Sequence, residues 1–268
     1  MADARRIVIT GAAGQVARGV RPLLREAGHR LTLLDLVDPD PVDGETAVVA
    51  SVTDTAVVRA ALAGADLVVH LGGLSRERPW AALADANVEG TRSVLEAARD
   101  TGVHRVLLAS SNHVVGFHPI PARPVEELDP RPDGYYGASK AAMEALGSVF
   151  ADRHGLAVVN VRIGSILERP VNRRTLSTWF SFPDVVRLIE AAAVLDEPGA
   201  HVVWGVSRNT RAWFSPVPGE RIGFHPRDDS EVHADAVLAA VGDRDDPDAN
   251  GLIGGEFAAP QHALGEPW

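Results

Sequence analysis

"IVITGAAGQVA", residues 7–17, joins a short apolar run to an amphipathic segment through a loop that contains Gly11 and Gly14. Glycines at a strand-to-helix turn let the backbone approach a pyrophosphate closely, and the first amides of the helix can bind its charge. Ala17 stands at the third position of the usual pattern, where a small residue is tolerated because helix packs on strand. A tight turn alone also favours glycine, so the loop needs a second feature in support.

That support is Asp35, which ends the second strand-like run "HRLTLLD" at residues 29–35. A carboxylate at this position can accept hydrogen bonds from both hydroxyls of an adenosine ribose, and it repels a 2'-phosphate. No arginine follows it directly, so the pattern favours NAD over NADP. The alternative is that Asp35 is an ordinary turn residue at a strand end.

Short β-branched runs alternate with longer amphipathic stretches over the first two thirds of the chain. The strand-like runs are "RRIVIT", "HRLTLLD", "DLVVHL", "HRVLLASS", "AVVNVRIGS" and "HVVWGV", and the helix-like stretches cover 15–28, 87–102 and 135–155. The three helices are expected to end at Gly28, Gly102 and Gly155. Such alternation predicts an α/β fold, a Rossmann-type doubly wound parallel sheet covered by helices on both faces.

After about residue 165 the alternation weakens, and Pro, Trp and Arg become frequent in "ERPVNRRTLSTWFSFP". We therefore expect one domain over residues 1–268, with an NAD-binding Rossmann core at about 1–165 and a small C-terminal substrate-side lobe and tail at about 166–268. The tail from residue 242 is polar and rich in turn residues, and we expect it to wrap the surface. Its role does not follow from the sequence.

The composition excludes several classes of partner. The net charge of -10 argues against sequence-independent binding of nucleic acid and against attraction to an anionic membrane. The first residues contain no apolar signal-like stretch, and no run is long enough to cross a bilayer. The absence of cysteine excludes disulfides and thiolate metal sites, and the histidines show no metal-ligand spacing. We expect a cytoplasmic protein without a metal.

"YYGASK", residues 135–140, contains both tyrosines of the chain and its only lysine. Residues four apart share a helix face, so Tyr136 can work with Lys140 whereas Tyr135 cannot. A free phenol has a pKa of about 10, and a neighbouring ammonium is expected to lower it so that the phenol can act as a base. Ser111, at the end of an apolar strand, would hold the oxygen that Tyr136 deprotonates. The alternatives are that Lys140 is an ordinary exposed residue of a helix and that Ser111 caps a helix or a turn.

These motifs, with "VVHLGG" at 68–73 and Asn87 in "NVEGT", make residues 5 to 225 resemble an extended short-chain dehydrogenase/reductase. Within that superfamily "SSNHVVGFHP", "RPDGYYGASK", "VRIGSILERPVNRRTLSTWFS" and "VVWGVS" are similar to the uronate dehydrogenase family. The resemblance implies oxidation of the anomeric carbon of a hexuronic acid, D-glucuronate or D-galacturonate, to the aldaro-lactone with NAD as acceptor. It also implies a homo-oligomer, because the superfamily commonly pairs through the helix that carries Tyr and Lys.

The resemblance further implies roles for individual residues, with Ser111, Tyr136 and Lys140 as the catalytic set. The residues expected to face the sugar acid are Ser75, Ser111, Asn112, His113, Ser165 and Arg174. The residues expected to line the cofactor are Gly11, Gly14, Gln15, Val16, Asp35, Ser51, Val52, Leu71, Gly72, Gly73, Tyr136 and Lys140. Ser51 stands where the family usually has an Asp that touches the adenine, so a weaker adenine contact is expected.

A uronate needs a guanidinium for its carboxylate, and "ERPVNRR" offers Arg169, Arg173 and Arg174. Arginine pairs with a carboxylate through two parallel hydrogen bonds, and with the resemblance Arg174 is favoured as this clamp. His113 is interpreted as a hydroxyl contact and His70 as structural. Without the resemblance, an arginine cluster in a loop is more often a solvated surface.

Two other functions fit part of the pattern. Sugar-nucleotide epimerases and dehydratases carry the same Ser, Tyr and Lys, but usually need a larger C-terminal lobe than the roughly one hundred residues available here. A non-catalytic NAD-sensing protein would have no need for Tyr136 and Lys140 at a spacing of four residues on one helix. The sequence does not rank glucuronate against galacturonate and does not give the oligomeric state.

Overall fold

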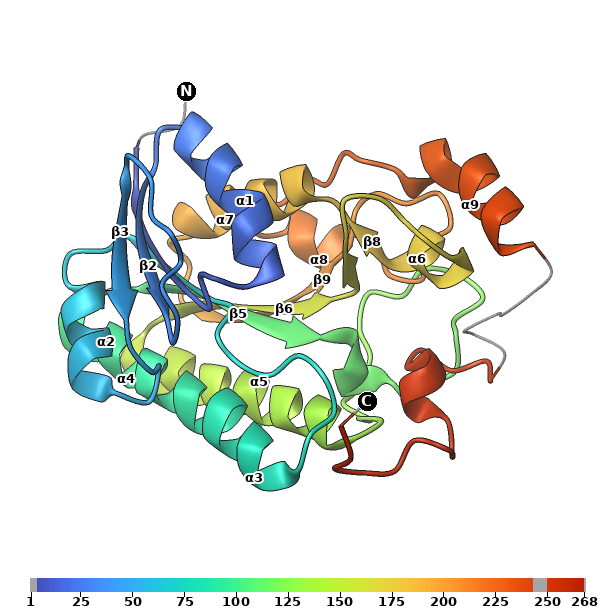
Figure 1. Ribbon diagram of the computed structural model, residues 1–268, viewed down its shortest axis with the longest axis horizontal. Coiled ribbons are helices and arrows are strands. Elements are labelled where there is room, and N and C mark those ends of the chain that lie inside the picture. Colours follow the sequence, from blue (N-terminus) through green and yellow to red (C-terminus); the bar gives the residue numbers. More distant parts are fainter. Residues whose placement is uncertain (1–3, 243–249, 268) are drawn as a thin grey trace.

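The computed structural model describes residues 4–242 and 250–267, and its centre is one parallel sheet in the order β3-β2-β1-β4-β5-β6-β9 (Figure 1). The strands are β1 (Arg6–Thr10), β2 (Arg30–Asp35), β3 (Glu45–Val49), β4 (Leu67–His70), β5 (Arg105–Ser111), β6 (Ala157–Ile163) and β9 (Gly199–Gly205), with β7 (Ser165–Ile166) and β8 (Trp179–Phe180) as a separate pair. The chain starts at the sheet centre, runs to one edge, and returns to build the other half. The predicted doubly wound fold is confirmed.

Helices cover both faces of this sheet, as expected for a parallel sheet. The α-helices of the described residues are α1 (Gln15–Glu26), α2 (Thr55–Leu62), α3 (Trp80–Leu83), α4 (Gly90–Thr101), α5 (Tyr135–His154), α6 (Arg173–Thr178), α7 (Phe182–Ala193), α8 (Val217–Glu220) and α9 (Ala234–Val241). Helices α1 and α7 lie together on one face, and α2, α4 and α5 lie side by side on the other (Figure 1).

The strands are almost continuously apolar because both faces of the sheet are buried. In β1, Ile7 and Ile9 belong to the hydrophobic core under α1 and α7, whereas Val8 belongs to the core under α2, α4 and α5. Successive side chains of a strand point to opposite faces, so one run of residues supplies both cores. The same alternation places Leu107 of β5 in the first core and Leu108 in the second.

The six strands expected from the sequence are all present, and the expected glycines follow the helix ends with positive φ, such as Gly102 at 74° and Gly155 at 69°. The sequence reading missed β3, an edge strand whose Val49 is exposed and whose pattern is weakly apolar. It also missed α7, which packs on the sheet beside α1. The division near residue 165 stays a prediction, and the core includes residues from both sides of it.

The C-terminal segment 250–267 packs beside the loop that follows β5. Gly254 N donates to the Gly116 carbonyl at 2.8 Å, and Ile253 N donates to the His118 carbonyl at 2.9 Å. This segment therefore lies near the carboxyl end of β5, and the expected substrate-side position of the tail stays a prediction. Among the described residues, no helix combines the length and the apolar character that a bilayer crossing requires.

Candidate active site

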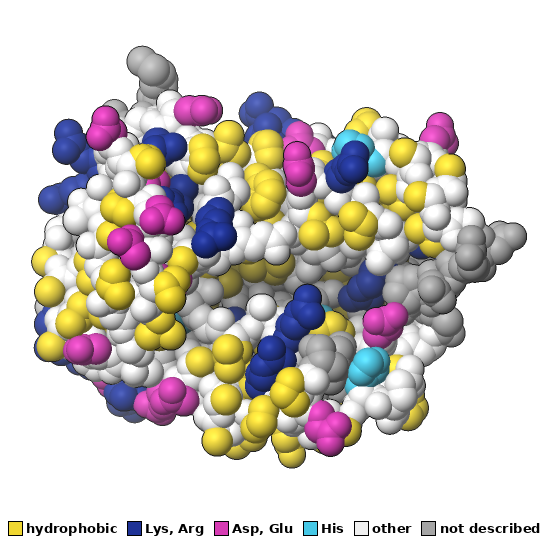
Figure 2. Space-filling view, in the orientation of Figure 1, with side chains coloured by type: hydrophobic (Ala, Val, Ile, Leu, Met, Phe, Trp, Pro, Cys, Tyr) yellow, Lys and Arg dark blue, Asp and Glu magenta, His cyan; other side chains and the backbone are white. Residues whose placement is uncertain are grey.

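Two adjoining cavities, of about 260 Å³ and about 350 Å³, lie at the carboxyl ends of the central strands. Figure 2 shows this face of the molecule hollowed across its middle. Gly11, Gly14, Leu71 and Gly73 line both cavities, so the two form one continuous site. The smaller cavity is also lined by Asp35, Ser51, Val52 and Gly72, and the larger by Gln15, Val16, Ser75, Ser111, His113, Tyr136 and Lys140. The structure thus brings together every residue that the sequence assigned to the cofactor.

The glycine loop lies in close contact with the loop after β4. Gly11 has a φ of 69°, in the left-handed region that favours glycine. A Cβ atom on Gly11 would lie 2.7 Å from the backbone nitrogen of Gly72, so any side chain would collide with the loop after β4. Glycine at this position therefore lets the two loops pack directly against each other, and both loops line the cavities.

Asp35 lies at the smaller cavity, at the end of β2. Its Oδ2 accepts a hydrogen bond from Ala13 N at 2.9 Å, and its Oδ1 accepts one from Val37 N at 3.3 Å. The carboxylate therefore ties the glycine loop to the strand end and also faces the cavity. The hydroxyl of Ser51, at the same cavity, is hydrogen-bonded to that of Thr53 at 2.7 Å.

Ser111, Tyr136 and Lys140 meet in the larger cavity, from the end of β5 and the first turns of α5. The Lys140 Nζ donates to the carbonyl oxygen of Ala109 at 2.7 Å and lies 5.8 Å from the centroid of the Tyr136 ring. Helical spacing of four residues puts phenol and ammonium on one face, as predicted.

Burial decides the ionisation of both groups. It raises the pKa of Tyr136 to about 12, while a hydrogen bond with Ser111 lowers that pKa and the Asp133 carboxylate raises it. Burial lowers the pKa of Lys140 to about 8. The expected lowering of the Tyr136 pKa is wrong for the polypeptide by itself, because removal of the phenolate from water outweighs the favourable contacts.

The lowered pKa of Lys140 has a consequence for stability. Its pKa is about 8 in the folded chain against 10.5 for the free group, so between these values the unfolded chain binds the extra proton. The free energy of unfolding should therefore rise as the pH goes from 8 to 10, by up to about 3 kcal/mol. Urea unfolding at several pH values tests this, and Lys140→Met should abolish the rise. A rise that persists in Lys140→Met contradicts the assignment.

His113 lines the larger cavity and is held by a buried carboxylate. Its Nδ1 lies 2.7 Å from Asp133 Oδ2, and its ring contacts those of Tyr136 and Phe257 at centroid distances of 5.7 Å and 4.0 Å. An imidazole in this environment presents its Nε2 in a fixed direction, which suits a contact to a sugar hydroxyl. His70, by contrast, is fully buried between Thr10 and Thr91, in agreement with a structural role.

Three expected substrate residues do not line the larger cavity. Asn112 is buried and accepts a hydrogen bond from the Ser111 hydroxyl at 3.4 Å. The hydroxyl of Ser165 is 3.0 Å from that of Thr178. Arg174, on α6, places its guanidinium carbon 5.1 Å from the centroid of the Trp213 ring. Their roles remain predictions.

The sequence analysis did not identify Glu77, whose buried carboxylate binds the start of α5. Its Oε2 accepts from Tyr136 N at 2.9 Å, and its Oε1 accepts from Tyr135 N at 3.1 Å and from Gly265 N at 2.9 Å. A carboxylate at a helix N-terminus accepts hydrogen bonds from amides that have no partner within the helix. Its negative charge also interacts favourably with the positive end of the helix dipole. No local signal could reveal it, because Glu77 is 58 residues from Tyr135 in the chain.

Glu77→Ala should lower the free energy of unfolding by about 3 kcal/mol, because three backbone donors lose a charged acceptor. Glu89→Ala is the matched control, since the Glu89 side chain is half exposed and pairs with Arg92 at the surface. That control should change stability by less than about 0.5 kcal/mol. Equal urea midpoints for the two variants would show that Glu77 does not stabilise the helix start.

Comparison with known proteins gives a consistent result. The family model described as NAD dependent epimerase/dehydratase family matches residues 7–214. The uronate dehydrogenase of Pseudomonas syringae pv. tomato is 40% identical over 260 residues, which cover 95% of this chain and 93% of that protein. The NAD-dependent glucose-6-phosphate dehydrogenase of Haloferax volcanii is 36% identical, with 84% of this chain and 94% of that protein covered.

Among solved structures, a variant of the Agrobacterium tumefaciens uronate dehydrogenase in complex with NAD superposes with a TM-score of 0.89. It is 38% identical, and the match covers 96% of this chain and 97% of that one. The resemblance inferred from the sequence motifs is therefore confirmed over nearly the whole chain.

Proposed function

Since this chain belongs to the NAD-dependent epimerase/dehydratase family, we propose that it oxidises the anomeric carbon of a hexuronic acid, as an NAD-dependent uronate dehydrogenase. The prediction of NAD as cofactor agrees with the family, and the glycine loop and Asp35, which line one cavity, fit it. The observation that carries the proposal is that Ser111, Tyr136 and Lys140 share one cavity next to that loop, in a chain 40% identical to a uronate dehydrogenase.

Bound NAD supplies the acceptor for the hydride that leaves carbon 1 of the sugar. Tyr136 takes the proton of the hydroxyl on that carbon, and Ser111 hydrogen-bonds the same oxygen as it becomes a carbonyl. The Lys140 ammonium, fixed by the Ala109 carbonyl, contributes a positive charge that favours the phenolate form of Tyr136, which is the form that accepts this proton. The ring oxygen stays attached to carbon 1, so the product is a lactone and no water is consumed.

The carboxylate of the substrate needs a cation that does not itself titrate. We assign this role to Arg174, whose planar guanidinium can form two parallel hydrogen bonds with a carboxylate. His113, oriented by Asp133, is assigned to a sugar hydroxyl. Ser75 at the cavity, together with Asn112 and Ser165, completes the proposed substrate set.

The experiment is to mix the purified protein and NAD with D-glucuronate or D-galacturonate and to follow the absorbance of NADH. Glucose, glucose 6-phosphate and NADP serve as controls. Rapid NADH formation that requires the carboxylate supports the proposal and also ranks the two uronates. If the rate with glucose 6-phosphate exceeds the rates with both uronates, the substrate is a sugar phosphate instead of a uronate. The guanidinium of Arg174 can also bind a phosphate group.

A sugar-nucleotide epimerase or dehydratase remains the alternative within the family. Such an enzyme would turn over a nucleoside diphosphate sugar without net formation of NADH. Product analysis after incubation with such a sugar therefore separates the two functions. A non-catalytic NAD-binding role would leave every one of these mixtures unchanged.

We further propose that the chain works as a homo-oligomer in the cytoplasm. Helix α5 has Tyr135 and Val149 exposed, and Ala138, Ala142 and Ala145 share their face at spacings of three and four residues. An apolar face of this kind suits a second copy of the same chain. Light scattering of the purified protein tests the assembly, and cell fractionation tests the location.

A further inference from the structure

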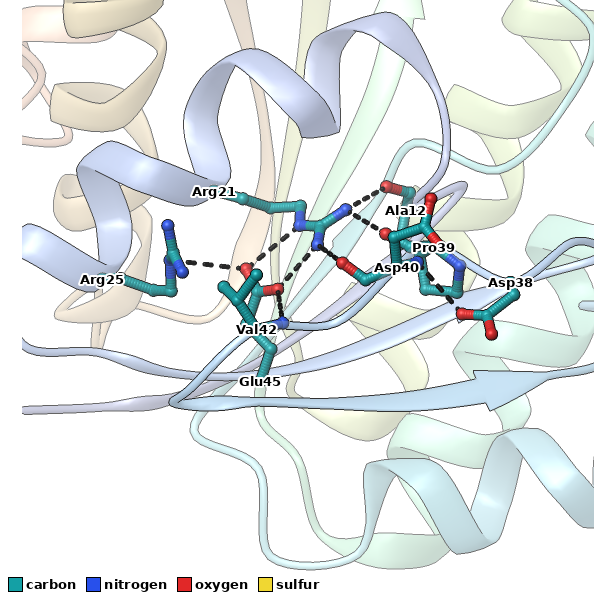
Figure 3. Close-up of polar contacts among 8 residues, drawn as sticks. All are labelled: Ala12, Arg21, Arg25, Asp38, Pro39, Asp40, Val42 and Glu45. Atoms are coloured by element: carbon teal, nitrogen blue, oxygen red, sulfur yellow. Dashed lines mark hydrogen bonds and ion pairs between the residues drawn. The ribbon is translucent and has the colours of Figure 1, made fainter.

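Arg21 of α1 is the centre of a buried polar network that includes Glu45 of β3 (Figure 3). Its Nε and Nη2 donate to the two carboxylate oxygens of Glu45 at 3.1 Å and 2.6 Å. The side chain of Glu45 is fully buried, and that of Arg21 is 9% exposed. A buried pair of this kind is stabilising only when its remaining donors are also satisfied.

The remaining donors of Arg21 bind carbonyl oxygens of two different loops. Nη1 donates to Ala12 O of the glycine loop at 3.4 Å and to Pro39 O at 2.7 Å. Nη2 donates to Asp40 O at 3.1 Å, in the same loop after β2 as Pro39. All five N–H groups of the guanidinium therefore have partners within the chain, and none is left to contact a ligand.

The loop after β2, residues 36–44, has a conformation that needs such support. Asp40 has a φ of 51° and is the one residue other than glycine with positive φ in the described part of the chain. This region is unfavourable for a residue with a Cβ atom and persists where surrounding contacts fix it. Asp38 accepts from Asp40 N at 3.0 Å, and Glu45 accepts from Val42 N at 3.0 Å.

Both loops contribute to the cofactor site. Gly11 and Gly14 of the glycine loop and Leu36 of the loop after β2 line the smaller cavity, next to Asp35. A site whose parts are held in place before binding loses less conformational entropy when the ligand arrives. The relative position of these two loops decides whether pyrophosphate and adenosine ribose can be bound at once.

We propose that Arg21 is a positioning residue for NAD, which fixes the glycine loop and the loop after β2 in one relative arrangement. It acts through backbone carbonyls and Glu45, without touching the cofactor. The inference rests on the proposed use of NAD but not on the identity of the sugar. This role requires the planar guanidinium with its five N–H donors, so lysine should not replace arginine at position 21.

The test is titration calorimetry with NAD on the unaltered full chain and three variants of it, each checked for folding by circular dichroism. Arg21→Lys keeps the charge and loses the fork, and the double variant Arg21→Met with Glu45→Leu removes the pair without leaving a buried unpaired carboxylate. Arg25→Met is the matched control, because Arg25 approaches the same Glu45 at 3.5 Å. Hydrogen exchange of the amides of residues 36–44 is followed in parallel.

We expect the Kd for NAD to rise about tenfold in Arg21→Lys and in the double variant, with faster exchange in residues 36–44. The rate with saturating NAD and uronate should stay unchanged, since the reacting groups are untouched. Arg25→Met should bind NAD within about twofold of the unaltered chain. Parent-like NAD affinity in Arg21→Lys overturns the proposal, as does unchanged exchange in the loop. If the unaltered chain itself fails to bind NAD, the proposed function fails, whereas the exchange measurement still reports on the loop.

Discussion

Tyr136→Phe should lower the kcat for uronate oxidation about a thousandfold, with little change in the Kd for NAD. The phenol oxygen is the group assigned to take the substrate proton, and general base catalysis by one side chain contributes about 10²- to 10⁴-fold. The aromatic ring, which is buried, stays in place. Steady-state rates of NADH formation and a separate NAD titration measure the two effects.

Tyr135→Phe is the matched control for this prediction. Tyr135 is the neighbouring residue and the second tyrosine of the chain, but it is 37% exposed and contacts Trp80 edge-on. Helical geometry places it on a different face from Lys140, so its hydroxyl should be dispensable. If both variants lose activity equally, the loss reflects damage to α5, and Tyr136 is not the base.

Arg174→Met should reduce kcat/KM for the uronate by about a thousandfold, which corresponds to about 4 kcal/mol of lost charge-assisted hydrogen bonding. Methionine retains an unbranched apolar stem that can still pack near Trp213, so the change mainly removes charge. The loss should fall on KM more than on kcat, because the carboxylate contact exists before and during the reaction. Activity with a neutral hexose should not decrease.

Arg173→Met separates this clamp from a general effect of basic charge. Arg173 is the adjacent residue and donates to the carbonyl of Gly242 at 3.2 Å. Its removal changes the net charge by the same amount and should leave kcat/KM within about twofold. Equal losses in the two variants would place the carboxylate contact elsewhere, with Arg169 as the next candidate.

The sequence predicted those parts of the site that local spacing controls. Tyr136 and Lys140 are four residues apart on one helix, so helical geometry alone places them together. Gly11 follows β1 and Asp35 ends β2, and the carboxyl ends of neighbouring parallel strands meet at one edge of the sheet. The alternation of apolar strands with amphipathic helices predicted the sheet class and its strands, apart from the weakly apolar edge strand β3.

Contacts between distant residues could not be predicted in the same way. Glu77 binds the start of α5 and the C-terminal segment, which lie 58 and 188 positions further along the chain. Arg21 joins two loops through backbone carbonyls, which carry no side-chain signature in a sequence. The sign of the Tyr136 pKa shift also escaped prediction, because it depends on how far the folded chain excludes water from the phenol.

The sequence by itself thus determined the fold class, the cofactor loop with its acid, and the Tyr and Lys pair, because each depends on short-range periodicity. Only the tertiary structure decided which buried charges support them and how the C-terminal segment packs beside the loop after β5. Those features depend on desolvation and on pairing across the fold, and both arise only when remote segments come into contact.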